Sequence, residues 1–339
     1  MPGGKYKTEA GDIPHRSALP PVIPETACTR VHSAVIAVTL IEAINNAEKK
    51  LAAGGVSNAR RDAEVLLCRA IKKDRAWLLA HIREEVETGP MTVFEESIAR
   101  RTRREPLQYI TGVQEFWGLE FAVNPSVLIP RPETELIVEA ALGSIPDRSA
   151  DIRLIDLCTG SGCIAVSLAR ELGRAQFFAT DTSPDALKTA RANAQRHGVA
   201  DRIRFFEGNL FDPLGELDIA GQIDMIVANP PYVSLADRPS LQAEVRDYEP
   251  HQALFAGPKG TEIEEQIFRE APPYLKSTGM LIMEIGVGQA RLLVELLQQD
   301  RHFRSCSVLK DLAGIDRVIV ASRQEQARKR TCSCTIPKL

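Results

Sequence analysis

The chain has 339 residues, of which 44% are hydrophobic and 26% are charged. This length predicts two domains, or one large domain with an appendage, and the composition excludes a wholly disordered chain. The 42 Lys and Arg residues and the 45 Asp and Glu residues give a formal net charge of −3. That balance disfavours a protein bound to nucleic-acid phosphates, because such proteins usually carry a basic excess.

The two ends of the chain, residues 1–34 and 323–339, are expected to be disordered. The first segment contains five prolines and lacks the marks of a signal or transit peptide. No run of about 18 apolar residues occurs, so no membrane-spanning helix is expected. The seven cysteines are odd in number and match no disulfide framework, which indicates a reducing cytoplasm. Cys332 and Cys334 lack two further ligands, so no metal site is expected.

Residues 35–106 predict a small helical domain. Its first helix has apolar residues at helical spacing and ends at Gly54 and Gly55. Ser57 is expected to cap a second helix and Asp74 a third. A fourth helix ends in cations, which suit the negative end of the helix dipole; they are Arg100, Arg101, Arg103 and Arg104. This cluster is either a solvated face or a basic surface for a partner.

Residues 107–130 change character and predict a short β-hairpin that links two domains. Tyr109–Thr111 and Phe116–Val123 are rich in β-branched and aromatic residues, and turn residues including Gly112 separate them. Two such runs on either side of a turn are typical of paired antiparallel strands.

Residues 131–322 predict an α/β domain, because strand and helix patterns alternate from about residue 150 onward. The expected strands are Arg153–Leu157, Gln176–Thr180, Arg202–Phe206, Ile223–Ala228, Met280–Ile285, Phe303–Leu309 and Arg317–Ala321. The expected helices are Ile164–Leu172, Asp185–His197, Glu262–Leu275 and Ala290–Gln299. Such a series folds as a mostly parallel sheet with helices on both faces. The last two strands, joined by a short turn, are expected to be antiparallel neighbours.

A glycine-containing loop follows the first strand of this domain and runs from Asp156 to Ala165. Gly160 and Gly162 let the backbone turn sharply toward a ligand, and Asp181 at the end of the next strand can bind both hydroxyls of a ribose. The loop fits a nicotinamide dinucleotide as well as S-adenosylmethionine. Asp156 favours the second cofactor, whose ammonium group needs an acceptor, whereas a pyrophosphate would be repelled by this acid.

Asn229-Pro230-Pro231-Tyr232 follows a buried strand, at the end where open α/β sheets place their sites. The two prolines fix the backbone and make this corner stiff. The Asn229 side-chain oxygen and the Pro230 carbonyl can accept the two N–H hydrogens of a planar amide or amino group, which aims its nitrogen at a methyl donor. Tyr232 can pack against the flat target group. A dehydrogenase would need a nearby His or Lys, and none is close in sequence.

These segments together resemble the HemK-type glutamine N5-methyltransferases of peptide chain release factors. The resemblance covers roughly residues 35–322. It is carried by Asp156–Gly162, Asn229–Tyr232, Arg104–Gly112, Val127–Glu135, Tyr248–Pro250 and Gly314–Arg317. It implies a seven-stranded, Rossmann-like class I methyltransferase sheet behind a helical domain that helps to dock the substrate. It also implies S-adenosylmethionine as cofactor and, as substrate, the Gln of the Gly-Gly-Gln loop in class I release factors.

The resemblance also implies roles for single residues. The cofactor would contact Asp156, Cys158, Thr159, Gly160, Ser161, Gly162, Asp181, Asn209, Leu210 and Asn229. The substrate glutamine would contact Pro130, Arg131, Asn229, Pro230, Pro231 and Tyr232, with Asn229, Pro230 and Tyr232 in catalysis. Two positions depart from the family pattern. Cys158 stands where glycine is common, which is tolerable only if its φ is negative, and Asn209 stands where an acid is common.

Three other hypotheses stay open at this point. Asn-Pro-Pro-Tyr also fits N6-adenine or N4-cytosine methyltransferases on nucleic acid, which would need a base-recognition domain and a basic channel. The glycine loop alone fits a nicotinamide-dependent oxidoreductase. A cofactor-binding adaptor without activity is disfavoured by the intact catalytic corner. We expect a cytoplasmic enzyme whose partners are class I release factors, with no membrane and no stable nucleic-acid partner.

Overall fold

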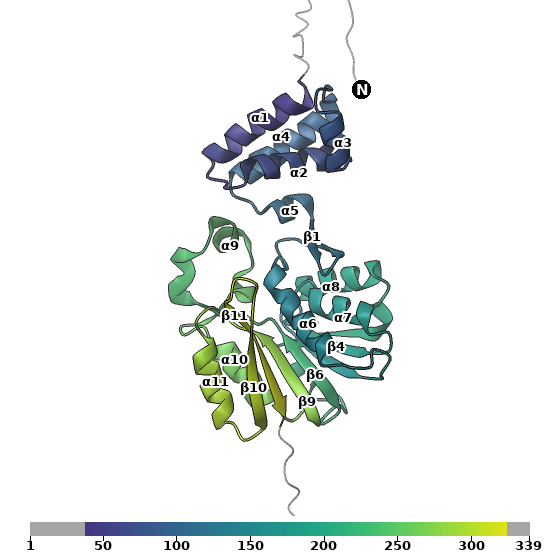
Figure 1. Ribbon diagram of the computed structural model, residues 1–339, viewed down its shortest axis with the longest axis vertical. Coiled ribbons are helices and arrows are strands. Elements are labelled where there is room, and N and C mark those ends of the chain that lie inside the picture. The colour runs from purple at the N-terminus through teal and green to yellow at the C-terminus, as the bar shows by residue number, and fades with distance from the viewer. Residues whose placement is uncertain (1–37, 324–339) are drawn as a thin grey trace, which may run out of the picture. The chain divides into compact units, whose positions relative to one another are not determined.

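The computed structural model describes residues 38–323, all of which belong to one compact unit (Figure 1). The expected disordered segment 1–34 and most of the expected tail lie outside the described residues. Arg323, which the sequence assigned to the tail, instead closes strand β11 (Asp316–Arg323).

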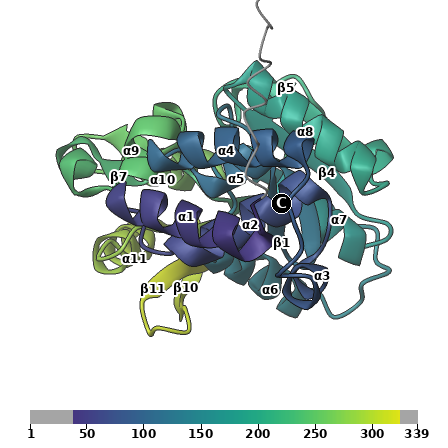
Figure 2. The same cartoon turned by 90° about the horizontal axis from the view of Figure 1, so that it is seen from above.

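Four helices form the first part of the described chain, as expected. They are α1 (Leu40–Ala53), α2 (Ala59–Ile71), α3 (Arg75–Ala80) and α4 (Thr88–Thr102), and Figures 1 and 2 show α1, α2 and α4 packed together. Their apolar faces share one core, which includes Ile44, Leu67 and Phe94. Asp74 caps α3 as predicted, since its Oδ1 accepts a hydrogen bond from the Trp77 N–H at 2.7 Å. The predicted cap at Ser57 is wrong, because Asn58 is the N-cap of α2 and makes no side-chain cap bond.

The linker differs from its prediction in its first half. Tyr109 to Thr111 belong to a short helix, α5 (Leu107–Thr111), and the hairpin consists of β1 (Val113–Phe116) and β2 (Leu119–Ala122). Tertiary contacts override the β propensity of this segment. The Tyr109 hydroxyl donates to the Val127 carbonyl at 2.6 Å, and Gly112 ends the helix with a φ of 77°.

Seven strands form the central sheet in the order β10-β11-β9-β6-β3-β4-β5. Their bounds are β3 (Arg153–Leu157), β4 (Gln176–Asp181), β5 (Ile203–Glu207), β6 (Ile223–Ala228), β9 (Leu275–Glu284), β10 (Phe303–Lys310) and β11 (Asp316–Arg323). Neighbours from β5 to β9 are parallel, whereas β11 is antiparallel to both β9 and β10. The expected α/β sheet and its antiparallel last pair are therefore confirmed.

Helices cover both faces of the sheet (Figure 1). One face packs on α6 (Glu135–Gly143), α7 (Cys163–Glu171) and α8 (Pro184–Arg196), and the other on α10 (Glu262–Glu270) and α11 (Ala290–Gln299). Because successive side chains of a strand point to opposite faces, Leu154 joins the first core and Ile155 the second. Helix α6 was not predicted, although Ile137, Val138 and Ala141 are buried on one of its faces.

The chain reverses its direction across the sheet between β3 and β6. It moves outward from β3 to β4 and β5, and then returns to the other side of β3 with β6. The carboxyl ends of β3 and β6 therefore bound the crevice in which open α/β sheets bind ligands. After β6, an unpredicted insertion contains β7 (Val233–Ser234), α9 (Ala243–Tyr248) and β8 (Phe255–Gly257), with β7 parallel to β8.

Candidate active site

A cavity lies at the carboxyl ends of β3, β4 and β6. Ten of the residues proposed from the sequence line it: Pro130, Cys158, Thr159, Gly160, Ser161, Asp181, Asn209, Leu210, Asn229 and Pro231. Five do not line it: Asp156, Gly162, Arg131, Pro230 and Tyr232. The fold thus brings the glycine loop, the acid at the end of β4 and the Asn-Pro-Pro-Tyr corner to one cavity.

Asp181 holds the glycine loop from the neighbouring strand. Its Oδ2 accepts the Gly160 backbone N–H and its Oδ1 the Ser183 N–H, both at 2.9 Å. Burial raises the pKa of this carboxyl, and the backbone bonds oppose that effect. Because a carboxylate has about four acceptor sites, it retains capacity for the two hydroxyls of a ribose.

The glycine loop contains a strained residue at its first position. Cys158 has a φ of 56°, so the requirement for a negative φ is not met. For a residue with a side chain this conformation costs about 1–2 kcal/mol. Leu210, which lines the same cavity, has a φ of 42°. Strained backbone of this kind concentrates at ligand sites, where the surrounding structure holds it in place.

Asp156 lies behind the loop, not on the cavity. Its side chain is 0% exposed, and its Oδ2 accepts a hydrogen bond from Thr159 Oγ1 at 2.5 Å. Burial raises its pKa to about 7, although the bond from Thr159 opposes the shift, and its Oδ1 has no hydrogen-bond partner among the described residues. In this structure Asp156 supports the loop, and its contact with a cofactor stays a prediction.

Asn229 lines the cavity and carries an unpaired side-chain acceptor. Its Nδ2 donates to Thr134 Oγ1 at 3.0 Å, whereas its buried Oδ1 has no partner among the described residues. A buried acceptor left without a hydrogen bond costs about 1–3 kcal/mol, and an N–H donor from a ligand recovers that loss. The corner can therefore bind an N–H group.

Two residues to which the sequence assigned no role surround this corner. Thr134 Oγ1 donates to Glu284 Oε2 at 2.6 Å, and the Tyr232 hydroxyl donates to Glu284 Oε1 at 3.1 Å. Burial raises the pKa of Glu284, and these two bonds oppose the shift. Tyr232 therefore faces a buried carboxyl rather than the cavity lining. The sequence offered one signal for Glu284, which is an acid at the end of an apolar strand. Such a buried acid is a candidate for a functional site.

Arg131 is tied to the insertion after β6. Its Nη2 forms an ion pair with Glu249 Oε1 at 2.5 Å, and the other oxygen of Glu249 accepts the Ile129 N–H at 3.4 Å. Glu249 is 3% exposed, and Arg131 lines a second cavity instead of the first. The pair therefore joins Val127–Glu135 to Tyr248–Pro250, two of the segments that carry the resemblance.

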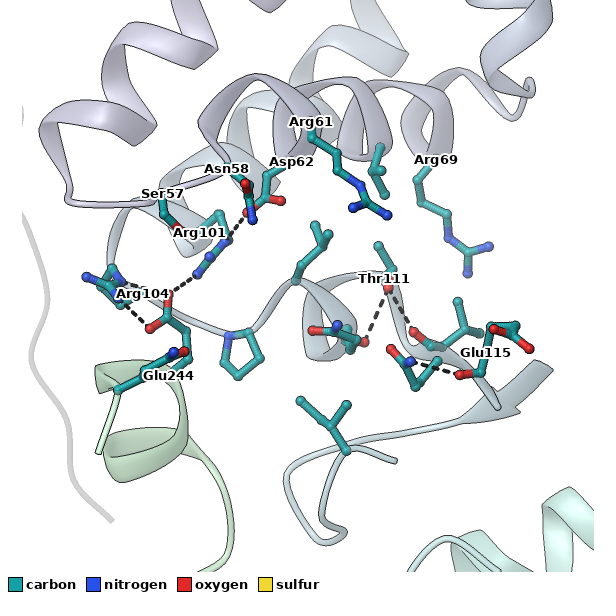
Figure 3. A pocket seen from close by; sticks show the side chains of 18 of the residues that line it. Ser57, Asn58, Arg61, Asp62, Arg69, Arg101, Arg104, Thr111, Glu115 and Glu244 are labelled. Atoms are coloured by element: carbon teal, nitrogen blue, oxygen red, sulfur yellow. Dashed lines mark hydrogen bonds and ion pairs between the residues drawn. The ribbon is translucent and has the colours of Figure 1, made fainter. Parts of the chain in front are cut away.

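The second cavity measures about 1310 Å³ and is lined by residues of α2, α5, β1 and α9 (Figure 3). Four cations of α2 and of the two residues that follow it line this cavity, and we call them the α2 cations: Arg61, Arg69, Lys72 and Lys73. Figure 3 shows Arg61 and Arg69 pointing from α2 toward the cavity. Within residues 38–323, none of the α2 cations forms an ion pair.

Three of the four arginines at the end of α4 form ion pairs within the chain, which neither interpretation of the sequence foresaw, whereas Arg103 is exposed and forms no ion pair among the described residues. Arg101 is buried, with Asp62 at 2.8 Å and Glu244 at 3.0 Å. Arg104 also pairs with Glu244, at 2.5 Å, and Arg100 pairs with Glu105. These three side chains therefore form ion pairs within the chain, and the pairs with Glu244 connect α4 to α9.

Across residues 38–323, no helix is both long and apolar enough to cross a membrane. The same residues contain no group of three or more His, Cys, Asp or Glu side chains placed to hold a metal ion.

Comparisons with known proteins identify the relatives of this chain. Residues 42–112 match the family model of the PrmC N-terminal domain, and residues 148–328 match that of a methyltransferase domain. The release factor glutamine methyltransferase of Geobacter sulfurreducens is 45% identical over 269 residues, which are 79% of this chain and 91% of that protein. The protein of the same name from Moorella thermoacetica is 42% identical over 289 residues, with 85% and 100% covered. A solved release factor-specific protein-(glutamine-N5) methyltransferase from Alicyclobacillus acidocaldarius is 29% identical, covers 60% of this chain and 100% of its own, and has a TM-score of 0.36. By its two sequence relatives, this chain belongs to the release factor glutamine methyltransferase family.

Proposed function

We propose that this protein transfers a methyl group from S-adenosylmethionine to the side-chain nitrogen (N5) of the Gln in the Gly-Gly-Gln motif of class I release factors. The observation that carries the proposal is the buried, unpartnered Oδ1 of Asn229 at the cavity. A primary amide offers two N–H hydrogens, and this oxygen is a fixed acceptor for one of them.

The cavity fits the proposed cofactor. Asp181 can accept hydrogen bonds from a ribose, and Asn209 and Leu210, which follow β5, would lie beside an adenine. The loop from Cys158 to Ser161 lines the cavity between them. When bound, S-adenosylmethionine supplies an electrophilic methyl group on a sulfonium sulfur.

The corner would act by holding a weak nucleophile in one orientation. An amide nitrogen reacts poorly because its lone pair is delocalised into the carbonyl. Asn229 Oδ1 would accept one N–H hydrogen and the Pro230 carbonyl the other, which turns the nitrogen lone pair toward the methyl group. Both acceptors also stabilise the positive charge that develops on nitrogen during transfer.

The residues around the cavity suit a reaction without a strong general base. No His or Lys is present among the described residues that line it. None is required, because the methylated nitrogen becomes acidic and can release its proton after the transfer. This feature favours methyl transfer over the oxidoreductase hypothesis, which needs a proton-exchanging side chain.

The proposal is tested by incubating the purified full chain with labelled S-adenosylmethionine and a class I release factor. We expect label on the wild-type factor and none on a factor whose Gly-Gly-Gln glutamine is replaced. Duplex DNA and RNA serve as parallel acceptors, since the same corner can hold an adenine or cytosine amino group. No label on the wild-type factor, or faster transfer to nucleic acid, would overturn the assignment.

We further propose that class I release factors are the protein's principal partners and that the reaction takes place in the cytoplasm. Family membership supports both statements. Co-purification of the tagged protein with a release factor from the cytoplasmic fraction tests them, and recovery with another cell fraction would contradict them.

A further inference from the structure

Glu284, Thr134 and Asn229 form a chain of hydrogen bonds at the ends of two neighbouring strands. In the parallel pair of β6 and β9, Ala228 lies opposite Met283, so the next residues, Asn229 and Glu284, emerge side by side. Thr134 closes the short 3-10 helix Pro132–Thr134 and lies between them. Thr134 is 1% exposed and Glu284 is 2% exposed, so water cannot readily replace the hydrogen bonds of this chain.

The hydrogen bonds in this chain have a single direction when Glu284 is ionised. Glu284 accepts two hydroxyls, from Thr134 at 2.6 Å and from Tyr232 at 3.1 Å, as an ionised carboxylate, which can only accept, would do. Burial and Glu133 raise the pKa of Glu284, whereas these two bonds and the charge of Arg317 on β11 oppose the shift and favour the ionised form. The single hydrogen of the Thr134 hydroxyl is thus given to Glu284, and Thr134 can only accept from its other neighbour.

That direction determines which end of the Asn229 amide faces Thr134. The group that lies 3.0 Å from Thr134 Oγ1 must be a donor, so it is the Nδ2 amino group. If the amide turned over, Oδ1 would face a hydroxyl oxygen with no hydrogen left to donate. The amide is therefore held with Nδ2 toward Thr134 and Oδ1 on the opposite side, and the buried carboxylate of Glu284, two hydrogen bonds away, sets that orientation.

We propose that Glu284 and Thr134 are positioning residues that fix the side chain of Asn229 with its oxygen toward the substrate nitrogen. Glu284 does so through Thr134, and its second oxygen holds the hydroxyl of Tyr232 at the end of the same corner. The kinetic consequence rests on the proposed glutamine methylation, whereas the orientation of the amide does not.

The kinetic test uses Thr134→Val, which keeps the shape and removes the hydroxyl, and Thr134→Ser, which restores it. We expect Thr134→Val and Glu284→Gln to lower kcat by about 10²-fold, as misplacement of a reacting group does. The KM for the release factor and the binding of S-adenosylmethionine should stay unchanged, and Thr134→Ser should keep wild-type turnover. The matched control is Thr189→Val on α8, another buried threonine, which should not alter kcat.

A double-mutant cycle separates positioning from a general structural effect. If Thr134 acts through Asn229, then Thr134→Val should cause little further loss in a chain that already carries Asn229→Ala. Multiplied losses in the double variant, with melting temperatures equal to wild type, would overturn the proposal.

A measurement without turnover keeps the inference independent of the proposed function. In protein labelled with ¹⁵N-asparagine, the side-chain amide signals that vanish in Asn229→Ala belong to Asn229. We expect their hydrogen exchange to be slow in wild type and Thr134→Ser, and fast in Thr134→Val and Glu284→Gln. Equal exchange in all four proteins would overturn the proposal. An inactive wild type with the expected exchange pattern would instead refute only the glutamine methylation.

Discussion

At the scale of single residues, Asp181 links the loop after β3 to the end of β4. We expect Asp181→Ala to weaken binding of S-adenosylmethionine roughly 10- to 100-fold, because hydrogen bonds to a charged group contribute about 1.5–3 kcal/mol each. Isothermal titration calorimetry measures this change. The control is Asp185→Ala, since Asp185 is 66% exposed and its one ion pair within residues 38–323 is with Lys188. Equal affinity in both variants would contradict the role of Asp181.

A second prediction at this scale concerns the buried carboxyl group of Glu264. Its side chain is 0% exposed, neither carboxyl oxygen has a hydrogen-bond partner among the described residues, and burial raises its pKa from 4.5 to about 8. The folded state therefore holds a proton that the unfolded state loses above pH 4.5. Stability linked to this group is present below pH 4.5 and decreases as the pH rises toward 8.

Glu264→Gln removes this dependence because an amide does not ionise. We expect the variant to be more stable than wild type at pH 8 by about 4 kcal/mol, and equally stable near pH 4.5. Urea denaturation at a series of pH values measures the difference. The exposed Glu139→Gln on α6 is the control. A stability gain that does not grow with pH would rule out the buried proton as its cause.

At the scale of elements, the start of α7 requires a glycine for two reasons. Gly162 has a φ of 79°, and a Cβ there would lie 3.1 Å from Ala190 Cβ on α8. Gly198 has a similar φ of 68° but no atom within 4 Å of such a Cβ. We expect Gly198→Ala to cost about 1 kcal/mol from backbone strain and Gly162→Ala about 1–3 kcal/mol more from overpacking. Urea denaturation checks this order, and equal losses would show that α7 and α8 can separate freely.

The central strands of the sheet were predictable because they are short apolar runs between turn residues. Ile223–Ala228 was placed with its observed bounds, since parallel strands buried on both faces read as continuous apolar segments. The segment Tyr109–Thr111 was misread because its β propensity is outweighed by packing of α5 against the helical core, which only the folded chain shows. Local pattern therefore predicted the sheet better than the linker.

The part of the site that one short sequence motif forms was predictable. The part that distant segments of the chain form together was not. The motif from Asn229 to Tyr232 marked the corner from the sequence alone. Thr134 and Glu284 lie 150 positions apart, and only the pairing of β6 with β9 brings Glu284 beside the corner. The φ of Cys158 was also unpredictable, since surrounding contacts hold the strain in place.

At the scale of the whole molecule, the net charge of −3 conceals a local excess of positive charge. The α2 cations line the large cavity without ion-pair partners within residues 38–323, while Arg100, Arg101 and Arg104 at the end of α4 are paired with nearby acids. Charges of one sign in a concave surface attract an oppositely charged partner over a distance comparable with the Debye length. Under the proposed function, the α2 cations would attract acidic groups of the release factor.

We expect Arg61→Glu combined with Arg69→Glu to raise the KM for the intact release factor at least about tenfold, because reversed charges repel an acidic partner. Turnover of a short peptide containing Gly-Gly-Gln should not change, since such a peptide reaches the active-site cavity without contacting α2. The salt dependence of kcat/KM for the intact factor should also become weaker. Steady-state kinetics at several salt concentrations measures all three quantities.

A second double variant separates this local effect from a change in total charge. Arg174→Glu combined with Arg291→Glu alters the net charge equally at two exposed positions, neither of which lines the large cavity. We expect its KM for the release factor to match wild type. Equal increases in KM in both double variants would mean that total charge governs the encounter. An unchanged KM after reversal of Arg61 and Arg69 would exclude the α2 cations from substrate docking, and the release factor would then be held by the active-site corner and the insertion after β6.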